Sequence, residues 1–215
     1  MLEPYSEFSL IKLNLSLEEL LPLFDDLELD NNDKSLYNLT PFRARKILYT
    51  KFIDNETYIL KNKEFVQSVN DVRKNKRVFK SFEPSKKDHE TLNLLLKSLF
   101  NFYNLKDNYD VIFHFVKIFA LESGSSNSPE GIHRDGFDIL VPCLVLERVN
   151  IEGGDSRIYD NGELVYKKII NSGEGLLLNE KDYVEMYHDV MPIKLKDASK
   201  TGYRTILGID INLLN

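Results

Sequence analysis

The sequence predicts a mainly β (α+β) protein in which an antiparallel sandwich or barrel follows supporting N-terminal helices. After about residue 110, short runs rich in β-branched and aromatic residues alternate with turn signals. Asn161-Gly162 joins two such runs and is the strongest hairpin signal in the chain. Before them, leucine and phenylalanine recur at three and four residues over 89–103, which predicts one helix with a core-facing stripe.

The first part of the chain, residues 1–110, is expected to form a helical and mixed support region. Ser16 has the side chain of an N-cap, so a helix should begin after it, although Pro22 must shorten that helix or lie in a first turn. Short runs at 52–60 and 77–82 are consistent with strands.

The second part, residues 111–215, is expected to hold the β core. Its first run, 111–121, is too apolar for a surface edge and too rich in aromatic and β-branched residues for an average helix. A polar loop follows at 122–128. Further strands are expected at 137–148, 155–160, 163–170, 174–179, 183–190 and 202–213.

The 215 residues suffice for one domain with a sizeable core, so we expect a single domain, residues 1–215. The net charge of −6 gives no reason to expect a nucleic-acid partner, which usually leaves a basic footprint. The single cysteine, Cys143, fits a reducing compartment and is expected to be a small buried hydrophobe. Without a signal peptide or membrane span, the protein should be cytoplasmic and have no membrane partner; its oligomeric state stays open.

His133-x-Asp135 is one half of a candidate metal site. On an extended strand, residues two apart point to the same face, so an imidazole nitrogen and a carboxylate oxygen can converge on one ion. The third candidate ligand is His188, in a distant strand-like run. Two neutral nitrogens and one anionic oxygen on one side of an ion leave open positions opposite, the arrangement expected of a non-haem Fe(II) oxygenase.

Arg204 lies inside an otherwise apolar β-run near the end of the chain. An arginine in such a run is costly to bury unless a carboxylate pairs with it, and its planar fork suits a bidentate carboxylate. A dicarboxylic cosubstrate would supply that partner. The alternative is a structural ion pair, for instance with Asp210.

The three candidate ligands and Arg204, in this order, resemble the Fe(II)/2-oxoglutarate-dependent dioxygenases. The resemblance implies Fe(II), 2-oxoglutarate and O2, with ascorbate as a stimulant, and succinate and CO2 as products. The far carboxylate of 2-oxoglutarate would pair with Arg204, and Thr205 or Tyr203 would add a hydrogen bond. Related halogenases have a small residue in place of the carboxylate ligand, so Asp135 implies hydroxylation.

A longer string, Pro129 to Asp138 with Glu152-Gly153-Gly154-Asp155 downstream, looks like the bacterial branch that includes the L-isoleucine hydroxylases acting on free amino acids. The match runs from about Val111 to the C-terminus and is faint before that. It implies that the β core is a double-stranded β-helix (jelly-roll, cupin-like).

The substrate implied by this resemblance is a small molecule, a free L-amino acid with an aliphatic or thioether side chain. Alternation puts Phe137 on the ligand side of its strand, whereas Asp138 faces away unless a bulge intervenes and is the candidate for a substrate ammonium. Phe113, Phe115 and Met186 either line an apolar pocket or belong to the core.

Two alternatives remain open. The nearer is the same chemistry on a peptide or a carrier-bound substrate. The more distant is a non-oxygenase β-barrel that binds Zn(II) or no metal and serves as a binding module. His114, inside an apolar strand, is expected to be a satisfied core or cavity-wall histidine rather than a ligand.

Overall fold

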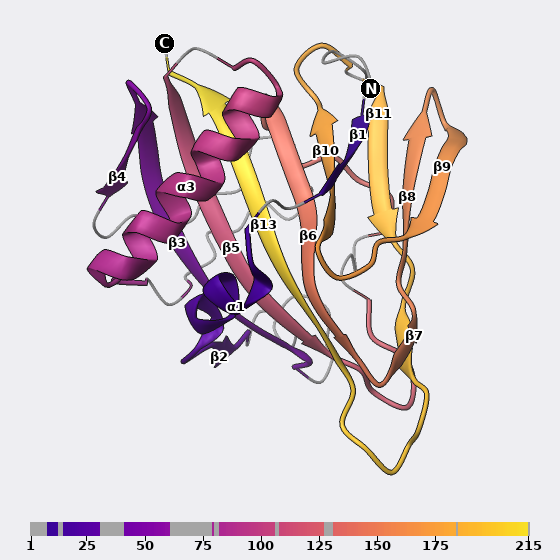
Figure 1. Cartoon of the computed structure of the whole chain (residues 1–215). Coiled ribbons are helices and arrows are strands. Elements are labelled where there is room, and N and C mark those ends of the chain that lie inside the picture. The colour runs from indigo at the N-terminus through magenta and orange to yellow at the C-terminus, as the bar shows by residue number, and fades with distance from the viewer. Residues whose placement is uncertain are drawn as a thin grey trace.

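The computed structural model describes residues 8–12, 15–30, 41–60, 79, 82–105, 108–126, 131–183 and 185–214. These residues form an eight-stranded antiparallel sheet in the order β1-β10-β6-β13-β5-β3-β2, with β4 paired to β3 (Figure 1). The strands are β1 (Phe8–Lys12), β2 (Glu28–Leu29), β3 (Arg43–Ile53), β4 (Glu56–Leu60), β5 (Tyr109–Phe119), β6 (Ile139–Val149), β10 (Glu174–Asn179) and β13 (Tyr203–Leu213).

Two smaller antiparallel sheets complete the β structure. One has the order β11-β8-β9, and the other pairs β12 with β7. Their strands are β7 (Ile151–Gly153), β8 (Asp155–Asp160), β9 (Glu163–Ile169), β11 (Met186–Val190) and β12 (Ile193–Leu195). The predicted mainly β, jelly-roll architecture is confirmed. The Asn161-Gly162 hairpin is also confirmed: both residues have positive φ, 49° and 82°, as a tight turn between β8 and β9 requires.

The two faces of the large sheet carry different cores because successive strand residues point to opposite sides. On the helix-covered face, Phe115 of β5 and Leu207 of β13 pack with Leu96 of the long helix. On the inter-sheet face, Ile118 of β5 and Ile206 of β13 pack with residues of the small sheets, such as Ile158 and Met186. The large sheet thus separates the helical layer from the two smaller sheets.

The helices predicted from the sequence are present, but α3 starts earlier than predicted. α3 (Lys86–Phe102) begins before the predicted residue 89 because Ser85 and Asp88 form a capping box, each side chain bonding the other's backbone N–H. α1 (Leu17–Leu20) begins after Ser16, as expected, and gives way to the 3-10 helix η1 (Leu21–Phe24), whose first turn holds Pro22. None of the helices in the described ranges is long and apolar enough to cross a membrane.

The N-terminal region also contributes strands to the large sheet. β1 pairs with β10, and β3 pairs with β5 along ten residue pairs from Arg43↔Ile118 to Phe52↔Tyr109. The predicted strand 52–60 is in fact the end of β3, a two-residue turn with positive φ at Asp54 and Asn55, and β4. Of the predicted strand 77–82, only residues 79 and 82 lie within the described residues.

Packing of α3 against the sheet can be tested with two leucines of that helix. Leu96 is fully buried, so Leu96→Ala should lower the free energy of unfolding by about 2–5 kcal/mol. Leu94 is 56% exposed and is the matched control, for which Leu94→Ala should change that free energy by less than about 0.5 kcal/mol. Urea unfolding measures both variants. Equal losses would contradict the assigned orientation of the helix.

Candidate functional site

A two-residue antiparallel bridge joins His133, in the segment before β6, to His188 of β11. The backbone N–H of His133 donates to the His188 carbonyl at 3.0 Å, and that of His188 donates to the His133 carbonyl at 2.9 Å. Directly opposed residues in such a bridge project their side chains to the same side. The two imidazole centroids accordingly lie 4.5 Å apart. Backbone pairing alone therefore sets the histidines side by side.

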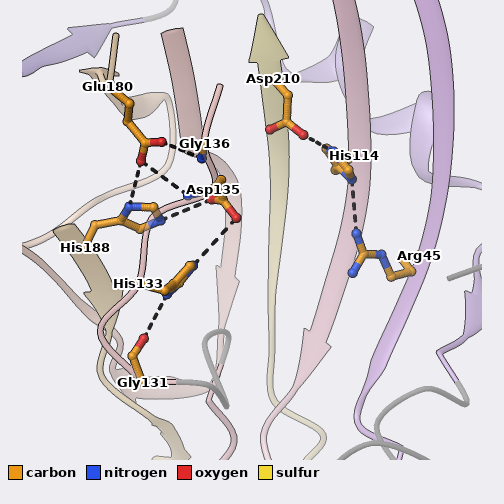
Figure 2. A network of polar contacts seen from close by, with 9 residues as sticks. All are labelled: Arg45, His114, Gly131, His133, Asp135, Gly136, Glu180, His188 and Asp210. Atoms are coloured by element: carbon orange, nitrogen blue, oxygen red, sulfur yellow. Dashed lines mark hydrogen bonds and ion pairs between the residues drawn. The ribbon is translucent and has the colours of Figure 1, made fainter. Parts of the chain in front are cut away.

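Asp135 completes this group two residues after His133. Its carboxylate lies 3.8 Å from Nε2 of His133 and 3.4 Å from Nε2 of His188. One possible ligand atom from each residue lies within 4.8 Å of the other two. The structure therefore brings together the three residues predicted as ligands, the metal triad (Figure 2). Asp135 lies in irregular backbone before β6, however, and not within the strand expected there.

The second ring nitrogen of each histidine points away from the triad. Nδ1 of His133 lies 2.8 Å from the Gly131 carbonyl, so it donates, and Nε2 is then the acceptor nitrogen of the ring. Nδ1 of His188 faces the Glu180 carboxylate at 3.6 Å. Outer acceptors of this kind fix the tautomer and the ring orientation of metal-binding histidines.

Glu180, in the turn after β10, was not predicted as a site residue. It is 1% exposed, and its Oε2 accepts a hydrogen bond from the Gly136 backbone at 2.8 Å. Its Oε1 lies 3.5 Å from the Asp135 backbone nitrogen and also faces His188 (Figure 2). One buried carboxylate thus connects the two chain segments that carry the metal triad.

The electrostatics of the triad favour a positive charge at His188. Burial opposes the charged form of Asp135, but the adjacent His188 holds the pKa of that carboxyl well below its usual range. Burial likewise opposes a charged His188, yet the carboxylates of Asp135 and Glu180 outweigh it and raise the pKa of His188 to about 10. The two carboxylates therefore stabilise a positive charge here, and a bound metal ion would take the place of the His188 proton.

Arg204 is completely buried in β13, on the inter-sheet face with Ile206. Within the described part of the chain, none of its three guanidinium nitrogens has a hydrogen-bond acceptor. The alternative ion pair with Asp210 is not formed, because Asp210 bonds His114 instead. A buried guanidinium without a carboxylate is costly, so this arrangement points to a ligand that supplies one.

Arg148 of β6, which sequence reasoning missed, lies directly opposite Arg204 in the β6–β13 pairing. Its Nη2 donates to the Gly153 carbonyl at 2.7 Å, while its buried Nη1 has no partner among the described residues. Burial and the charge of Arg204 lower the pKa of Arg148. A Cβ at Gly154 would lie 3.4 Å from Nη1 of Arg148 and 3.7 Å from Nη1 of Arg204. The guanidiniums of Arg148 and Arg204 therefore both lie close to Gly154, which has no side chain to fill the space between them.

Thr205 does not lie beside the guanidiniums of Arg148 and Arg204. As the neighbour of Arg204 in β13, it projects from the other face of the sheet, where its hydroxyl donates to Glu147 at 2.7 Å. Tyr203 projects from that same face, and its ring lies beneath the Lys117 ammonium. Neither residue contacts the Arg204 guanidinium, which corrects the expectation of an added hydrogen bond from them.

The residues considered for substrate binding lie in different parts of the structure. Phe137 and Met186 are buried in the inter-sheet core cluster. Phe113 and Phe115 belong to the helix-covered face, where Phe115 contacts Phe24 of η1, so of the two alternatives for them the structure favours core packing. Asp138 accepts from the Leu213 backbone at 2.7 Å and thereby holds the end of β13.

His114 lies on the inter-sheet face of β5 and is not one of the triad. Its Nε2 lies 2.6 Å from Asp210, and its Nδ1 lies 3.1 Å from Arg45 of β3 (Figure 2). The expectation of a satisfied histidine is met by these two contacts.

A family model described as 2OG-Fe dioxygenase matches residues 21–210 of the chain. No curated relative matches the sequence significantly. The fold is similar to that of a bsmA homolog from Methylobium petroleophilum PM1, with a TM-score of 0.77 at 19% identity, over 93% of this chain and 82% of the other.

Two further solved structures have similar folds. IDO from Bacillus thuringiensis has a TM-score of 0.70 at 17% identity, over 98% of this chain and 91% of the other. The Fe(II)/(alpha)ketoglutarate-dependent dioxygenase TqaL has a TM-score of 0.67 at 15% identity, over 97% and 83%. At these identities the likeness establishes the fold alone.

The role of Glu180 predicts a change in metal affinity. Glu180→Gln keeps the size of the side chain but removes the charge that faces His188, so binding of a divalent metal should weaken about ten- to a hundred-fold. Anaerobic Fe(II) titration measures this. Glu163→Gln, at an exposed position of β9, is the control and should leave the affinity unchanged. Equal affinities for the two variants would remove Glu180 from the metal centre.

Proposed function

The chain belongs to the 2OG-Fe dioxygenase family, and from this premise we propose that it hydroxylates an unactivated C–H bond of a free L-amino acid. The enzyme is a dioxygenase, and its family uses Fe(II), 2-oxoglutarate and O2. The observation that carries the proposal is the convergence of His133, Asp135 and His188 on one point. Succinate and CO2 would be the other products.

The metal triad would hold one Fe(II). Two neutral imidazole nitrogens and one carboxylate oxygen form the donor set that suits this ion and leaves positions for other ligands. Bound iron would supply the oxidising chemistry with 2-oxoglutarate and O2. The chain itself orients the donor atoms, through the His133–His188 bridge and through Glu180. A carboxylate at Asp135 favours hydroxylation over halogenation.

Arg204 and Arg148 would bind the far carboxylate of 2-oxoglutarate. Both guanidiniums donate only, and the three Arg204 nitrogens and Nη1 of Arg148 lack acceptors among the described residues, which supports an anionic ligand between them. A carboxylate there would replace repulsion between two like charges with two charge-assisted contacts. The apolar Ile118 and Ile206 nearby in the sheet would exclude water from these contacts.

An apolar substrate side chain is supported by the residues next to the triad. Phe137 follows Asp135 by two positions and Met186 precedes His188 by two, and both are buried in the inter-sheet cluster. These neighbours suit an aliphatic or thioether group. The single buried cysteine, Cys143, suits the reducing cytoplasm that we propose as the location.

The iron assignment predicts that His133→Ala or His188→Ala abolishes consumption of 2-oxoglutarate while circular dichroism shows an intact fold. Each substitution removes one of three ligands, so iron occupancy should fall as well. His89 of α3, whose Nε2 contacts the Thr57 carbonyl, offers a control, and His89→Ala should retain turnover. A triad variant with near wild-type turnover and full iron occupancy would refute the assignment.

The carboxylate site predicts that Arg204→Met raises the 2-oxoglutarate requirement about ten- to a hundred-fold with iron binding intact, because a charge-assisted contact is lost. Arg148→Met should raise it in the same direction. 2-Oxobutyrate, which lacks the far carboxylate, serves as the control ligand, and its affinity should change in neither variant. Anaerobic binding titrations measure both keto acids. An unchanged 2-oxoglutarate affinity in Arg204→Met would assign this arginine a purely structural role.

A further inference from the structure

A polar cluster that the metal and cosubstrate sites do not use lies on the inter-sheet face: Arg45, Tyr49, His114 and Asp210. Its members come from three adjacent strands, β3, β5 and β13. Tyr49 and Asp210 are both paired with Ile112 of β5, from opposite sides, so their side chains leave the sheet on one face in one row. Arg204 projects from this same face, because it lies an even number of residues before Asp210 in β13. Figure 2 shows His114 and Asp210 beside the metal triad.

His114 is held in one tautomer by its neighbours. Arginine can only donate, so Nδ1 of His114 accepts from Arg45 at 3.1 Å, and Nε2 carries the hydrogen that it donates to Asp210 at 2.6 Å. Gly208, opposite His114 in β13, leaves space for the ring, because a Cβ there would lie 3.3 Å from that of His114. His114 thereby orients the carboxylate of Asp210 on the inter-sheet face.

Two acceptors of this cluster are unused. His114 bonds only Oδ2 of Asp210, and within the described residues Oδ1 has no hydrogen-bond donor. The Tyr49 hydroxyl is buried and also lacks a partner in the described part of the chain. The side chain of Asp210 is 8% exposed. Oδ1 of Asp210 and the Tyr49 hydroxyl can therefore each accept an N–H group from a ligand.

The charge required of that ligand is positive. Burial raises the pKa of Asp210, the nearby charge of Asp135 adds to the rise, and His114 and Arg45 oppose it. Burial and the charge of Asp210 raise the pKa of Tyr49 to about 12. Burial therefore disfavours the ionised Asp210 carboxylate, and a cation beside it would offset this cost.

We propose that Asp210, with the Tyr49 hydroxyl from the same row of the sheet, binds the positively charged ammonium group of the amino-acid substrate. This inference rests on the proposed function, because it takes the substrate to lie next to the metal triad. An ammonium offers three donors, which suit the carboxylate oxygen and the phenol oxygen. His114 and Arg45 are positioning residues: His114 orients Asp210, and both oppose the rise of its pKa. Asp210 thereby takes the role expected of Asp138.

Equilibrium binding tests the proposal without relying on turnover. Calorimetry would compare each proteinogenic L-amino acid with its N-acetyl derivative on protein loaded with Fe(II) and 2-oxoglutarate in the absence of oxygen. N-acetylation removes the charge and keeps the side chain. At least one free amino acid should bind wild type about ten- to a hundred-fold more tightly than its derivative. Asp210→Asn should remove most of this preference, and the matched control Asp138→Asn should retain it.

A second variant keeps the proposal testable if Asp210→Asn does not fold. Tyr49→Phe removes one oxygen atom and should weaken binding of the free amino acid about threefold or more, with no effect on the N-acetyl derivative. The proposal is overturned if wild type shows no preference for any free amino acid, or if the preference survives in every folded variant. Iron-dependent consumption of 2-oxoglutarate by wild type, without added substrate, reports on the proposed function separately.

Discussion

The period-two alternation of β13 is the constraint on which the rest of the molecule depends. Its odd-numbered residues, such as Leu207 and Ile209, pack under the helices, and its even-numbered residues, from Arg204 to Asp210, face the small sheets. A slip of one residue would turn every one of these side chains to the wrong face. The long pairings with β5 and β6 fix the register, and the helix-covered core makes any slip expensive.

The inter-sheet face combines three unbalanced charges in a small space. The metal triad favours a cation, the paired Arg148 and Arg204 favour an anion, and Asp210 with its free oxygen favours another cation. Buried charges without partners destabilise a fold, so their concentration here and not on the helix-covered face marks where ligands complete the structure. The order of charges along the face also orients the ligands relative to one another.

Residue types and chain order were enough to predict that His133, Asp135 and His188 come together, that Arg204 lies in a strand, and that the second half is rich in β structure. These features depend on the chemistry of single residues and on the periodicity of short segments. β3 was missed at its start because Arg43, Arg45 and Lys46 interrupt the apolar pattern, although all three lie in the sheet. Glu180 and Arg148 carry no local signal: one lies in a turn-like polar run, the other at the end of a strand. Their burial arises from segments distant in sequence. For Phe115 the sequence pattern was visible but ambiguous: alternation shows that the residue points to one face of the sheet and does not say which face carries the site.

The opposition of Arg148 and Arg204 has a consequence for how long the protein survives in a cell. Two like charges buried against each other reduce the stability of the folded chain until an anion lies between them. A ligand that binds only the folded state raises its stability with the logarithm of the ligand concentration. Proteases remove the unfolded fraction, and a difference of about 1–2 kcal/mol changes abundance several-fold. The supply of the dicarboxylic keto acid would therefore govern how much enzyme persists, as well as how fast each molecule works.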